Sequence, residues 1–308
     1  MPNNAPFDNL SYLVTLLVMV ATTHPQYAIG RFAAAALRRQ GRERAELVSQ
    51  LLFGEPVRIL ESNKNWSRIA CAEDGFEAYI RNEQIKAVDE LTFLRQKSSP
   101  AFALDLFAPV LGNQFALPIT LGARLPDFDG LHLHLDDKRY TYSGQAAMSA
   151  DLKTSPELII KLARKLLYVP QLSGGRTPSG IDSAALVQLI GRIVGLQLPR
   201  TAETQANCGR TVDFMVQCQA ADLAFFDDNR GNINHVGFIL PDSRILHAGD
   251  CVRIDAIDHY GIFNFERGRY THRLRIVKRL LPDMKQQDVL KTKKEMEEVD
   301  PAQLSVFG

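Results

Sequence analysis

The sequence of 308 residues is poor in cysteine and has no excess of charge of either sign. None of its four cysteines, Cys71, Cys208, Cys218 and Cys251, lies at the Cys-x-x-Cys or Cys/His spacing of a structural zinc site. A disulfide-dense secreted scaffold is also excluded, although one or two bridges stay open. Lys and Arg total 36 and Asp and Glu total 35, so the net charge is +1. Without a basic excess we expect no nucleic-acid partner.

Long hydrophobic runs are also lacking. The most apolar segment, Leu10 to Ala21, has about 12 residues, whereas a membrane span needs roughly 20, so we expect no transmembrane helix. The segment at 1–28 is either the core of a secretory signal or a helix packed on the first domain. Because residues 1–30 contain no Lys or Arg, the positive start of a signal is missing and the compartment stays open. The charge-dense end, at 283–308, is predicted to be a solvated tail without chemistry.

Two β modules are predicted in the first half of the chain. Residues 31–90 contain short alternating runs separated by turn signals, of which Asp74-Gly75 is the strongest. Residues 100–150 repeat this texture. Several strands within about 60 residues are typical of a small barrel. We therefore predict barrels at 29–90 and 91–153.

The periodicity changes after Ser155. Apolar residues recur at helical spacing over 156–168, and a loop rich in Gly, Pro, Ser and Thr follows. Asp182 stands where a helix N-cap is expected, ahead of a second apolar run. Strand-like segments come next, at 222–226, 235–240, 244–247, 251–255 and 272–278. Helices followed by strands predict an α+β domain at 154–282.

Three polar residues of this domain are candidates for acyl-transfer chemistry. Ser183 opens the helix after the glycine-rich loop, His235 begins an apolar strand, and His247 ends another. A nucleophile at a helix N-terminus with a histidine base would suit this chemistry, whereas the structural alternative is a capping serine and hydrogen-bonded histidines. His132 and His134 alternate on one strand face but lack a third ligand. We expect no metal site and no cofactor.

An ordered series of motifs across about 155–280 resembles the NlpC-type cell-wall cysteine peptidases. The series is Gly174 to Asp182, Leu198-Pro199-Arg200 with Gln205, Asp222 to Phe226, His235-Val236-Gly237, Ile245 to Ala248 and Val252 to Asp255. The upstream modules resemble the bacterial SH3-like barrels of the branch that cuts γ-D-glutamyl–diamino acid bonds in peptidoglycan peptides. The resemblance implies a papain-like α+β core in a bacterial protein, with peptidoglycan-derived peptides as its ligands.

At the reactive centre the sequence departs from the family pattern. The family's Asp-Cys-Ser-Gly reads Asp-Ser-Ala-Ala here, so its nucleophile falls on Ser183. Its base falls on His235 and its third polar residue on His247. Gln171 and Ser173 replace the Tyr and Trp of the family's Pro-Tyr-x-Trp-Gly-Gly. Departures clustered at one centre indicate a natural relative that has lost peptidase activity.

The remaining candidates are ligands of a bound peptide. Beside the nucleophile position these are Asp182, Arg176 and Gln171. The resemblance implies that an acidic residue and a tyrosine of the first barrel hold the substrate's free amino end, and Glu46 and Tyr79 are the candidates, with Phe76 competing for the second role. The alternative is a surface glutamate and a barrel-core aromatic ring.

The sequence leaves three alternative hypotheses for the function. The first is a catalytically silent peptidase fold that binds peptidoglycan peptides or a partner protein. The second is an active hydrolase of the same peptides with Ser183 as nucleophile and His235 as base. The third is a scaffold whose barrels carry the function while the C-terminal domain only packs.

Overall fold

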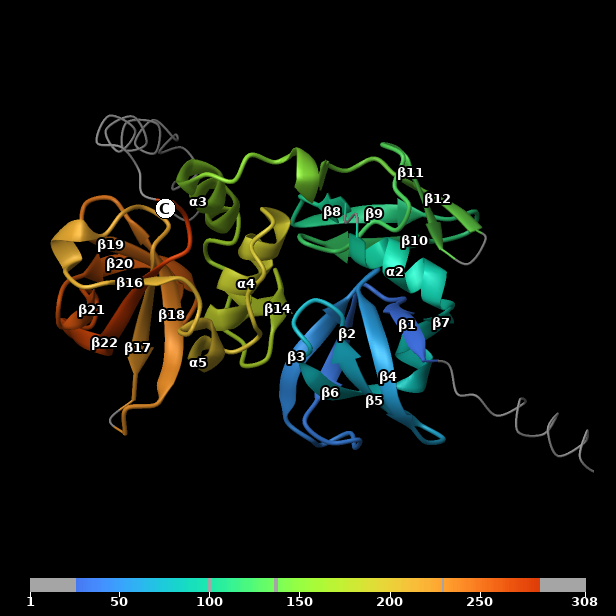
Figure 1. Cartoon of the computed structure of the whole chain (residues 1–308), viewed down its shortest axis with the longest axis horizontal. Helices are drawn as coiled ribbons and strands as arrows, with labels where there is room; N and C mark the ends of the chain where they lie inside the picture. Colours follow the sequence, from blue (N-terminus) through green and yellow to red (C-terminus); the bar gives the residue numbers. More distant parts are fainter. Residues whose placement is uncertain (1–25, 99–100, 136–137, 229, 283–308) are drawn as a thin grey trace, which may run out of the picture.

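The computed structural model describes residues 26–98, 101–135, 138–228 and 230–282. The predicted segment at 1–28 lies outside this part of the chain except for its last three residues. The whole predicted tail at 283–308 also lies outside it. Two β modules precede a domain of helices and strands (Figure 1). This is the predicted α+β class.

The first module is a seven-stranded antiparallel sheet in the order β3-β2-β6-β5-β4-β1-β7. Its strands are β1 (Tyr27–Gly30), β2 (Ala34–Arg38), β3 (Leu47–Leu52), β4 (Pro56–Ser62), β5 (Trp66–Cys71), β6 (Glu77–Arg81) and β7 (Ile85–Val88). Asp74-Gly75 joins β5 to β6 as predicted, and Gly75 has a positive φ of 71° that favours glycine. The first strand begins two residues before the expected barrel start at 29.

The second module follows the helix α2 (Glu90–Ser98). It combines a four-stranded sheet, β10-β9-β12-β11, with a two-stranded one, β13-β8. The strands are β8 (Ala101–Ala103), β9 (Phe107–Leu111), β10 (Ala116–Thr120), β11 (His132–Leu135), β12 (Lys138–Tyr142) and β13 (Ala146–Met148). Phe53 of the first module lies in the core of the second, so apolar packing joins the two.

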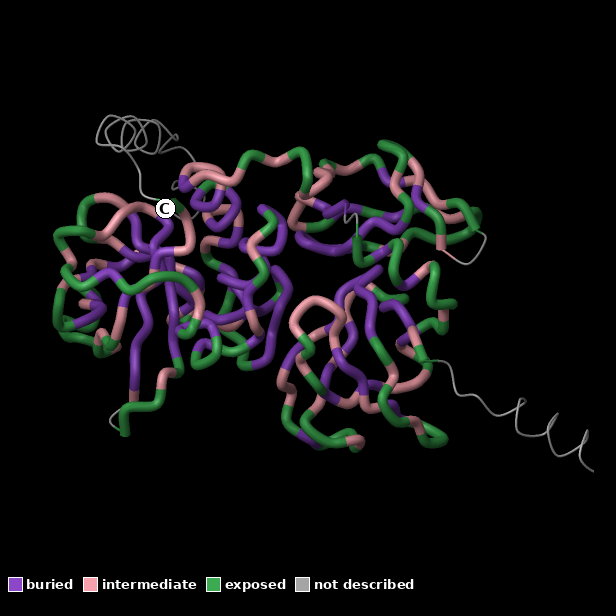
Figure 2. The backbone as a smooth tube through the Cα atoms, in the orientation of Figure 1, coloured by how far each residue is buried: buried purple, intermediate pink, exposed green. Residues whose placement is uncertain are grey.

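The C-terminal domain begins with helices that lie between its sheet and the two β modules (Figure 1). These are α3 (Pro156–Arg164), α4 (Ser183–Ile193) and α5 (Ala202–Gln205), with the short strands β14 (Arg176–Thr177) and β15 (Gly180–Ile181) ahead of α4. Every residue of α4 is buried. Figure 2 shows this burial as a continuous stretch through the centre of the molecule.

The sheet of this domain has the order β16-β22-β17-β18-β19-β20-β21. Its strands are β16 (Arg210–Val212), β17 (Leu223–Asp227), β18 (Ile233–Leu240), β19 (Arg244–Ala248), β20 (Val252–Ile257), β21 (Gly261–Asn264) and β22 (Arg269–Arg279). An additional pairing of β21 with β22 closes the sheet into a barrel, with β16 attached outside it. Alternate residues therefore face either the helices or the barrel interior.

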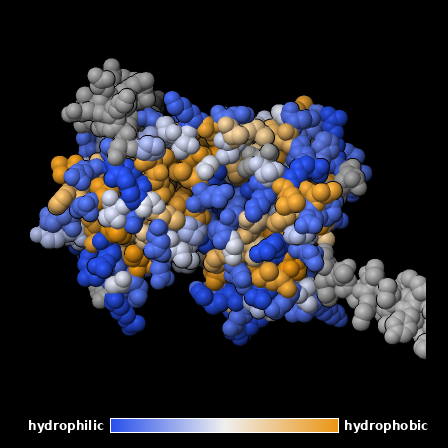
Figure 3. Space-filling view, viewed as in Figure 1, coloured by the Kyte–Doolittle hydropathy of each residue, from blue (hydrophilic) through white to orange (hydrophobic). Residues whose placement is uncertain are grey.

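Two observations concern the surface. Within the described ranges, no helix is both long enough and apolar enough to cross a membrane. Figure 3 shows polar side chains spread over the visible face of all three modules, with apolar patches between them.

Candidate functional site

The start of α4 is fixed by the carboxylate of Asp182. Its Oδ1 accepts the amide hydrogen of Ala185 at 2.7 Å, which is the predicted N-cap, and its Oδ2 accepts that of Gly174 at 3.0 Å. Arg200 donates to both oxygens. This cap places Ser183 in the first turn of α4, 6% exposed.

The loop before α4 is held from two sides. The Gln171 amide donates to the Asp250 carbonyl at 3.0 Å, and Gln171 also forms a parallel bridge with Ile181, two residues before Ser183. The Gln171 side chain donates to Ser173 Oγ at 3.4 Å. Both residues that depart from the family pattern upstream therefore lie in one loop next to the N-terminus of α4.

His235 and His247 lie on neighbouring strands and face the barrel interior. Alternation puts His235 on the same side of β18 as Ile239, and His247 on the same side of β19 as Ile245. His235 Nε2 lies 2.8 Å from His247 Nδ1, and His247 Nε2 lies 3.1 Å from Asp255 Oδ2. The three side chains form a buried relay from β18 through β19 to β20.

Burial sets the protonation of this relay. Burial, followed by the proximity of His247 and His272, lowers the pKa of His235 well below its ordinary value, so the ring is neutral at pH 7. Burial raises the pKa of Asp255, but the hydrogen bond from His247 and the charge of Arg253 outweigh it and hold the pKa below its ordinary value. Asp255 is therefore ionised and accepts hydrogen bonds.

A third histidine, His272 on β22, belongs to the same cluster. Its ring stacks on His235 with centroids 4.1 Å apart and lies 5.5 Å from the His247 ring. Burial and His247 lower the pKa of His272 to about 4. Sequence reasoning missed this residue and gave Asp255 no role. A histidine inside an alternating strand carries no local signal of its partners.

The predicted nucleophile position and predicted base are not joined by a hydrogen bond in the described part of the chain. Ser183 opens α4, and α4 packs on the helix-facing side of β18 through residues such as Val236. His235 points to the other side of that strand at its end. The predicted catalytic roles of Ser183, His235 and His247 stay predictions.

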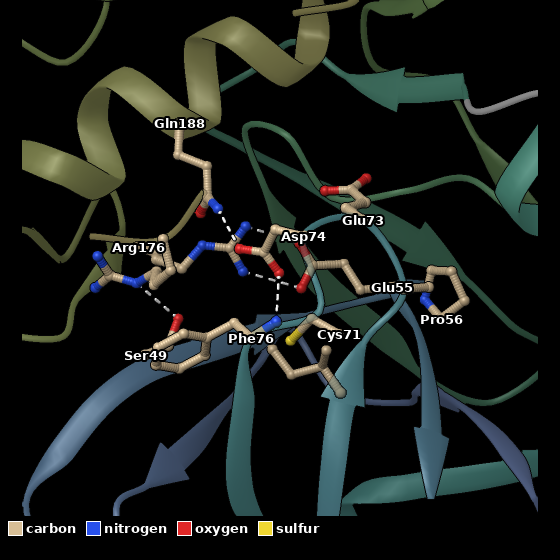
Figure 4. Close-up of a pocket in the computed structure, with 12 residues that line it drawn as sticks. Ser49, Glu55, Pro56, Cys71, Glu73, Asp74, Phe76, Arg176 and Gln188 are labelled. Atoms are coloured by element: carbon tan, nitrogen blue, oxygen red, sulfur yellow. Dashed lines mark hydrogen bonds and ion pairs between the residues drawn. The ribbon is translucent and has the colours of Figure 1, made fainter. Parts of the chain in front are cut away.

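One predicted peptide ligand, Arg176, lies at the junction between the first module and α4 (Figure 4). The buried Arg176 guanidinium donates to Glu55 at 3.0 and 3.1 Å and to the Gln50 carbonyl at 2.6 Å. Glu55 also pairs with Arg192 of α4. The pocket beside them has a volume of about 20 Å³, which suits about one water molecule rather than a peptide.

The other two predicted ligands lie on the first module. Glu46 is 62% exposed and pairs with Arg39 at 2.6 Å. Tyr79 is half-buried on β6, next to Gly41. The contacts of Arg176 and Asp182 are structural, and those of Glu46 lie at the surface. The roles of these three residues and of Tyr79 toward a ligand stay predictions.

A larger open pocket lies at the histidine cluster. We call it the histidine pocket; it has a volume of about 320 Å³ and is lined by Gln171, His235, His247, Ala248, Gly249, Asp250, Arg253, Asp255, Asn264, Arg267, Thr271 and His272. Of the predicted peptide ligands, only Gln171 lines it. Its lining carries both charges, because Arg267 pairs with Asp250 and Arg253 with Asp255.

Comparison with known proteins gives two matches along the chain. Residues 37–85 match the bacterial dipeptidyl-peptidase SH3 domain, and residues 169–266 match the NlpC/P60 family. The chain is 30% identical over 113 residues to γ-D-glutamyl-L-lysine dipeptidyl-peptidase of Bacillus subtilis strain 168, covering 36% of this chain and 38% of the relative. It is 34% identical over 88 residues to a probable endopeptidase NlpC homolog of Haemophilus influenzae, covering 28% of this chain and 45% of the relative. These matches span less than half the length of either curated relative.

Solved structures show the same fold. A crystal structure of an NlpC/P60 family protein from Bacillus cereus superposes with a TM-score of 0.71 and 17% identity, covering 83% of this chain and 100% of that one. An NlpC/P60 endopeptidase from Photobacterium damselae superposes with a TM-score of 0.58 and 14% identity, covering 82% and 71% of the two chains. The predicted architecture, an NlpC-type domain after SH3-like modules, is confirmed.

Proposed function

We propose that the chain binds peptidoglycan peptides without cleaving them, as residues 169–266 match the NlpC/P60 family. The observation that carries this proposal is the hydroxyl of Ser183 where the family's thiol is expected. The four cysteines lie elsewhere. Burial raises the pKa of three of their thiols, Cys71, Cys218 (to about 11) and Cys251, so none of these three replaces the missing nucleophile.

A serine at this position starts from a much weaker nucleophile. A cysteine thiol has a pKa of about 8.5, which a helix N-terminus and a cationic histidine bring into the physiological range. A helix N-terminus contributes about 0.3–1 kcal/mol, which is less than one pKa unit. A hydroxyl ionises only far above the physiological pH range, and that contribution is too small to bring its pKa into this range. Ser183 would need proton transfer to His235 in the reaction step, and the two residues share no hydrogen bond among the described residues.

The histidine pocket offers what a short peptide of mixed charge needs. Arg267 and Arg253 provide cationic donors, while Asp250 and Asn264 provide acceptors. Arg267 is 47% exposed, so it can exchange its surface partner Asp250 for a ligand carboxylate. Peptides built from L-Ala, γ-D-Glu and a diamino acid carry both carboxylates and ammonium groups, which match this lining.

Calorimetry and product analysis with an L-Ala-γ-D-Glu-diamino acid peptide test the proposal. We expect binding to the wild type, no released dipeptide by liquid chromatography, and weaker binding by Arg267→Ala. Arg269→Ala is the matched control, because Arg269 is exposed at the start of β22 and does not line the histidine pocket.

Each other outcome contradicts the proposal. Release of the dipeptide that Ser183→Ala abolishes would establish the alternative, an active hydrolase with Ser183 as nucleophile. No binding of this peptide or of longer cell-wall fragments would leave the scaffold function and overturn both peptide-based ones.

A further inference from the structure

We propose that His235, His247 and His272 bind a divalent transition-metal ion, with Zn²⁺ as the reference ion. The three rings come from β18, β19 and β22, and one nitrogen of each lies within 4.8 Å of the others. Among the described residues this is the one group of three or more His, Cys, Asp or Glu side chains that meets such a geometry. Imidazole nitrogen is a preferred ligand of Zn²⁺, Cu²⁺ and Ni²⁺.

The three rings are gathered within reach of one ion, although their nitrogens are not yet at the spacing of a tetrahedral site. With Zn–N distances of about 2.0–2.1 Å, two nitrogens on one tetrahedral ion lie about 3.3–3.4 Å apart. His235 Nε2 and His247 Nδ1 are 2.8 Å apart, slightly closer than this. The ion would take the place of their hydrogen bond. The His272 ring stacks on His235 with an interplanar angle of 27°, so it would have to turn out of the stack to point a nitrogen at the ion.

Hydrogen bonds on the far sides of two rings support ligation. His247 Nε2 lies 3.1 Å from Asp255 Oδ2, which leaves Nδ1 for the metal. His272 Nδ1 lies 2.9 Å from Thr271 Oγ1, which leaves Nε2 for the metal. Such carboxylate or hydroxyl partners orient histidine ligands and fix their tautomers in metal sites.

The cluster is also accessible to an ion. All three histidines line the histidine pocket, and His235 and His272 also line a second open space of about 750 Å³. Three protein nitrogens leave one tetrahedral position for water or for a carboxylate of a bound ligand. A metal on His235 Nε2 would leave this neutral ring with its proton on Nδ1, so the metal-loaded chain would have no histidine base at position 235.

The inference goes beyond the proposed peptide binding and does not depend on it. Its test is equilibrium dialysis of the full chain against Zn²⁺ with metal analysis, together with the absorption spectrum of the Co²⁺-substituted protein. We expect one ion per chain and a tetrahedral Co²⁺ spectrum without a sulfur charge-transfer band. The His272→Ala variant should bind at least about 10-fold more weakly, because it loses a ligand.

His259→Ala is the matched control, because His259 is exposed between β20 and β21 and lies outside the cluster. Circular dichroism of each variant checks that it is folded, and His272→Gln provides a second variant that keeps a polar side chain. No stoichiometric binding by the wild type, unchanged affinity in both His272 variants, or a sulfur charge-transfer band would each overturn the inference.

Discussion

His247 Nε2 lies 3.1 Å from Asp255 Oδ2, and this bond determines which nitrogen of each histidine carries a proton. The ionised Asp255 can only accept, so His247 Nε2 is the donor, and in the neutral form of the ring His247 Nδ1 is then an acceptor. His235 Nε2, 2.8 Å away, must then donate to it. The free lone pair of neutral His235 is therefore on Nδ1, and that atom is the base available to a bound ligand.

Asp255 is predicted to be a positioning residue for the histidine cluster. Asp255→Ala should lower Zn²⁺ affinity by about 10–100-fold, because an unanchored His247 ring loses its orientation and tautomer. The measurement is competition of each variant with a chromophoric chelator. Asp258→Ala is the control, since Asp258 accepts from Tyr270 at the surface instead. Equal affinities in the two variants would contradict the role given to Asp255.

Replacing the hydroxyl at position 183 tests whether the rest of the reactive centre is intact. Ser183→Cys should cleave an L-Ala-γ-D-Glu-diamino acid peptide at least about 10²-fold faster than the wild type, because loss of a nucleophile costs several decades of rate. Timed chromatography of the product measures this rate, and Ser183→Ala should match the wild type. An inactive Ser183→Cys variant would show that Gln171 and the two alanines after residue 183 also prevent catalysis.

The junction between the first module and α4 is predicted to control stability. Glu55 is buried and accepts from both Arg176 and Arg192, so Glu55→Gln leaves two buried guanidiniums with a neutral partner. We expect a loss of about 3–5 kcal/mol in the free energy of unfolding, measured in urea. Glu46→Gln breaks an exposed pair with Arg39 and should change stability little. Similar losses in both variants would contradict the importance of burial here.

The same junction predicts a loss of stability in acid. Burial raises the pKa of Glu73, but Arg192 and Arg124 outweigh it and lower the pKa to about 2, below about 4.3 for an unfolded glutamate. A depressed folded-state pKa stabilises the protein fully above the unfolded value, and this contribution is lost as the pH falls from about 4.3 toward 2. Thermal melts between pH 7 and pH 2 should show a steeper decline for the wild type than for Glu73→Gln. Parallel curves would exclude this contribution of Glu73.

Local signals predicted the parts of the site that depend on neighbouring residues. The N-cap at Asp182 and the hairpin at Asp74-Gly75 follow from short-range turn and cap chemistry. The apolar residues that follow His235 predict a strand, and His235 does lie in β18. The same reasoning did not predict the ion-pair partner of Asp182. This partner is Arg200, which lies in a different connecting segment of the chain.

Long-range partners could not be predicted in the same way. His272 reaches the cluster only because β22 pairs with both β17 and β21, and both pairings contain a register irregularity that changes which side chains face inward. Arg176 meets Glu55 across 121 residues of sequence. Neither register shifts nor such distant ion pairs leave a pattern in a single sequence.

Gly174 has a φ of +77°, and a Cβ atom on it would lie 2.4 Å from the Leu47 carbonyl oxygen of the first module. The backbone of the loop before α4 thus rests directly on strand β3, without a side chain between them. Exchange of the first module for that of a relative would therefore have to reproduce the path of β3 as well as its charges. In a chimaera, the loop and this strand would therefore have to be exchanged together, although more than a hundred residues separate them in the chain.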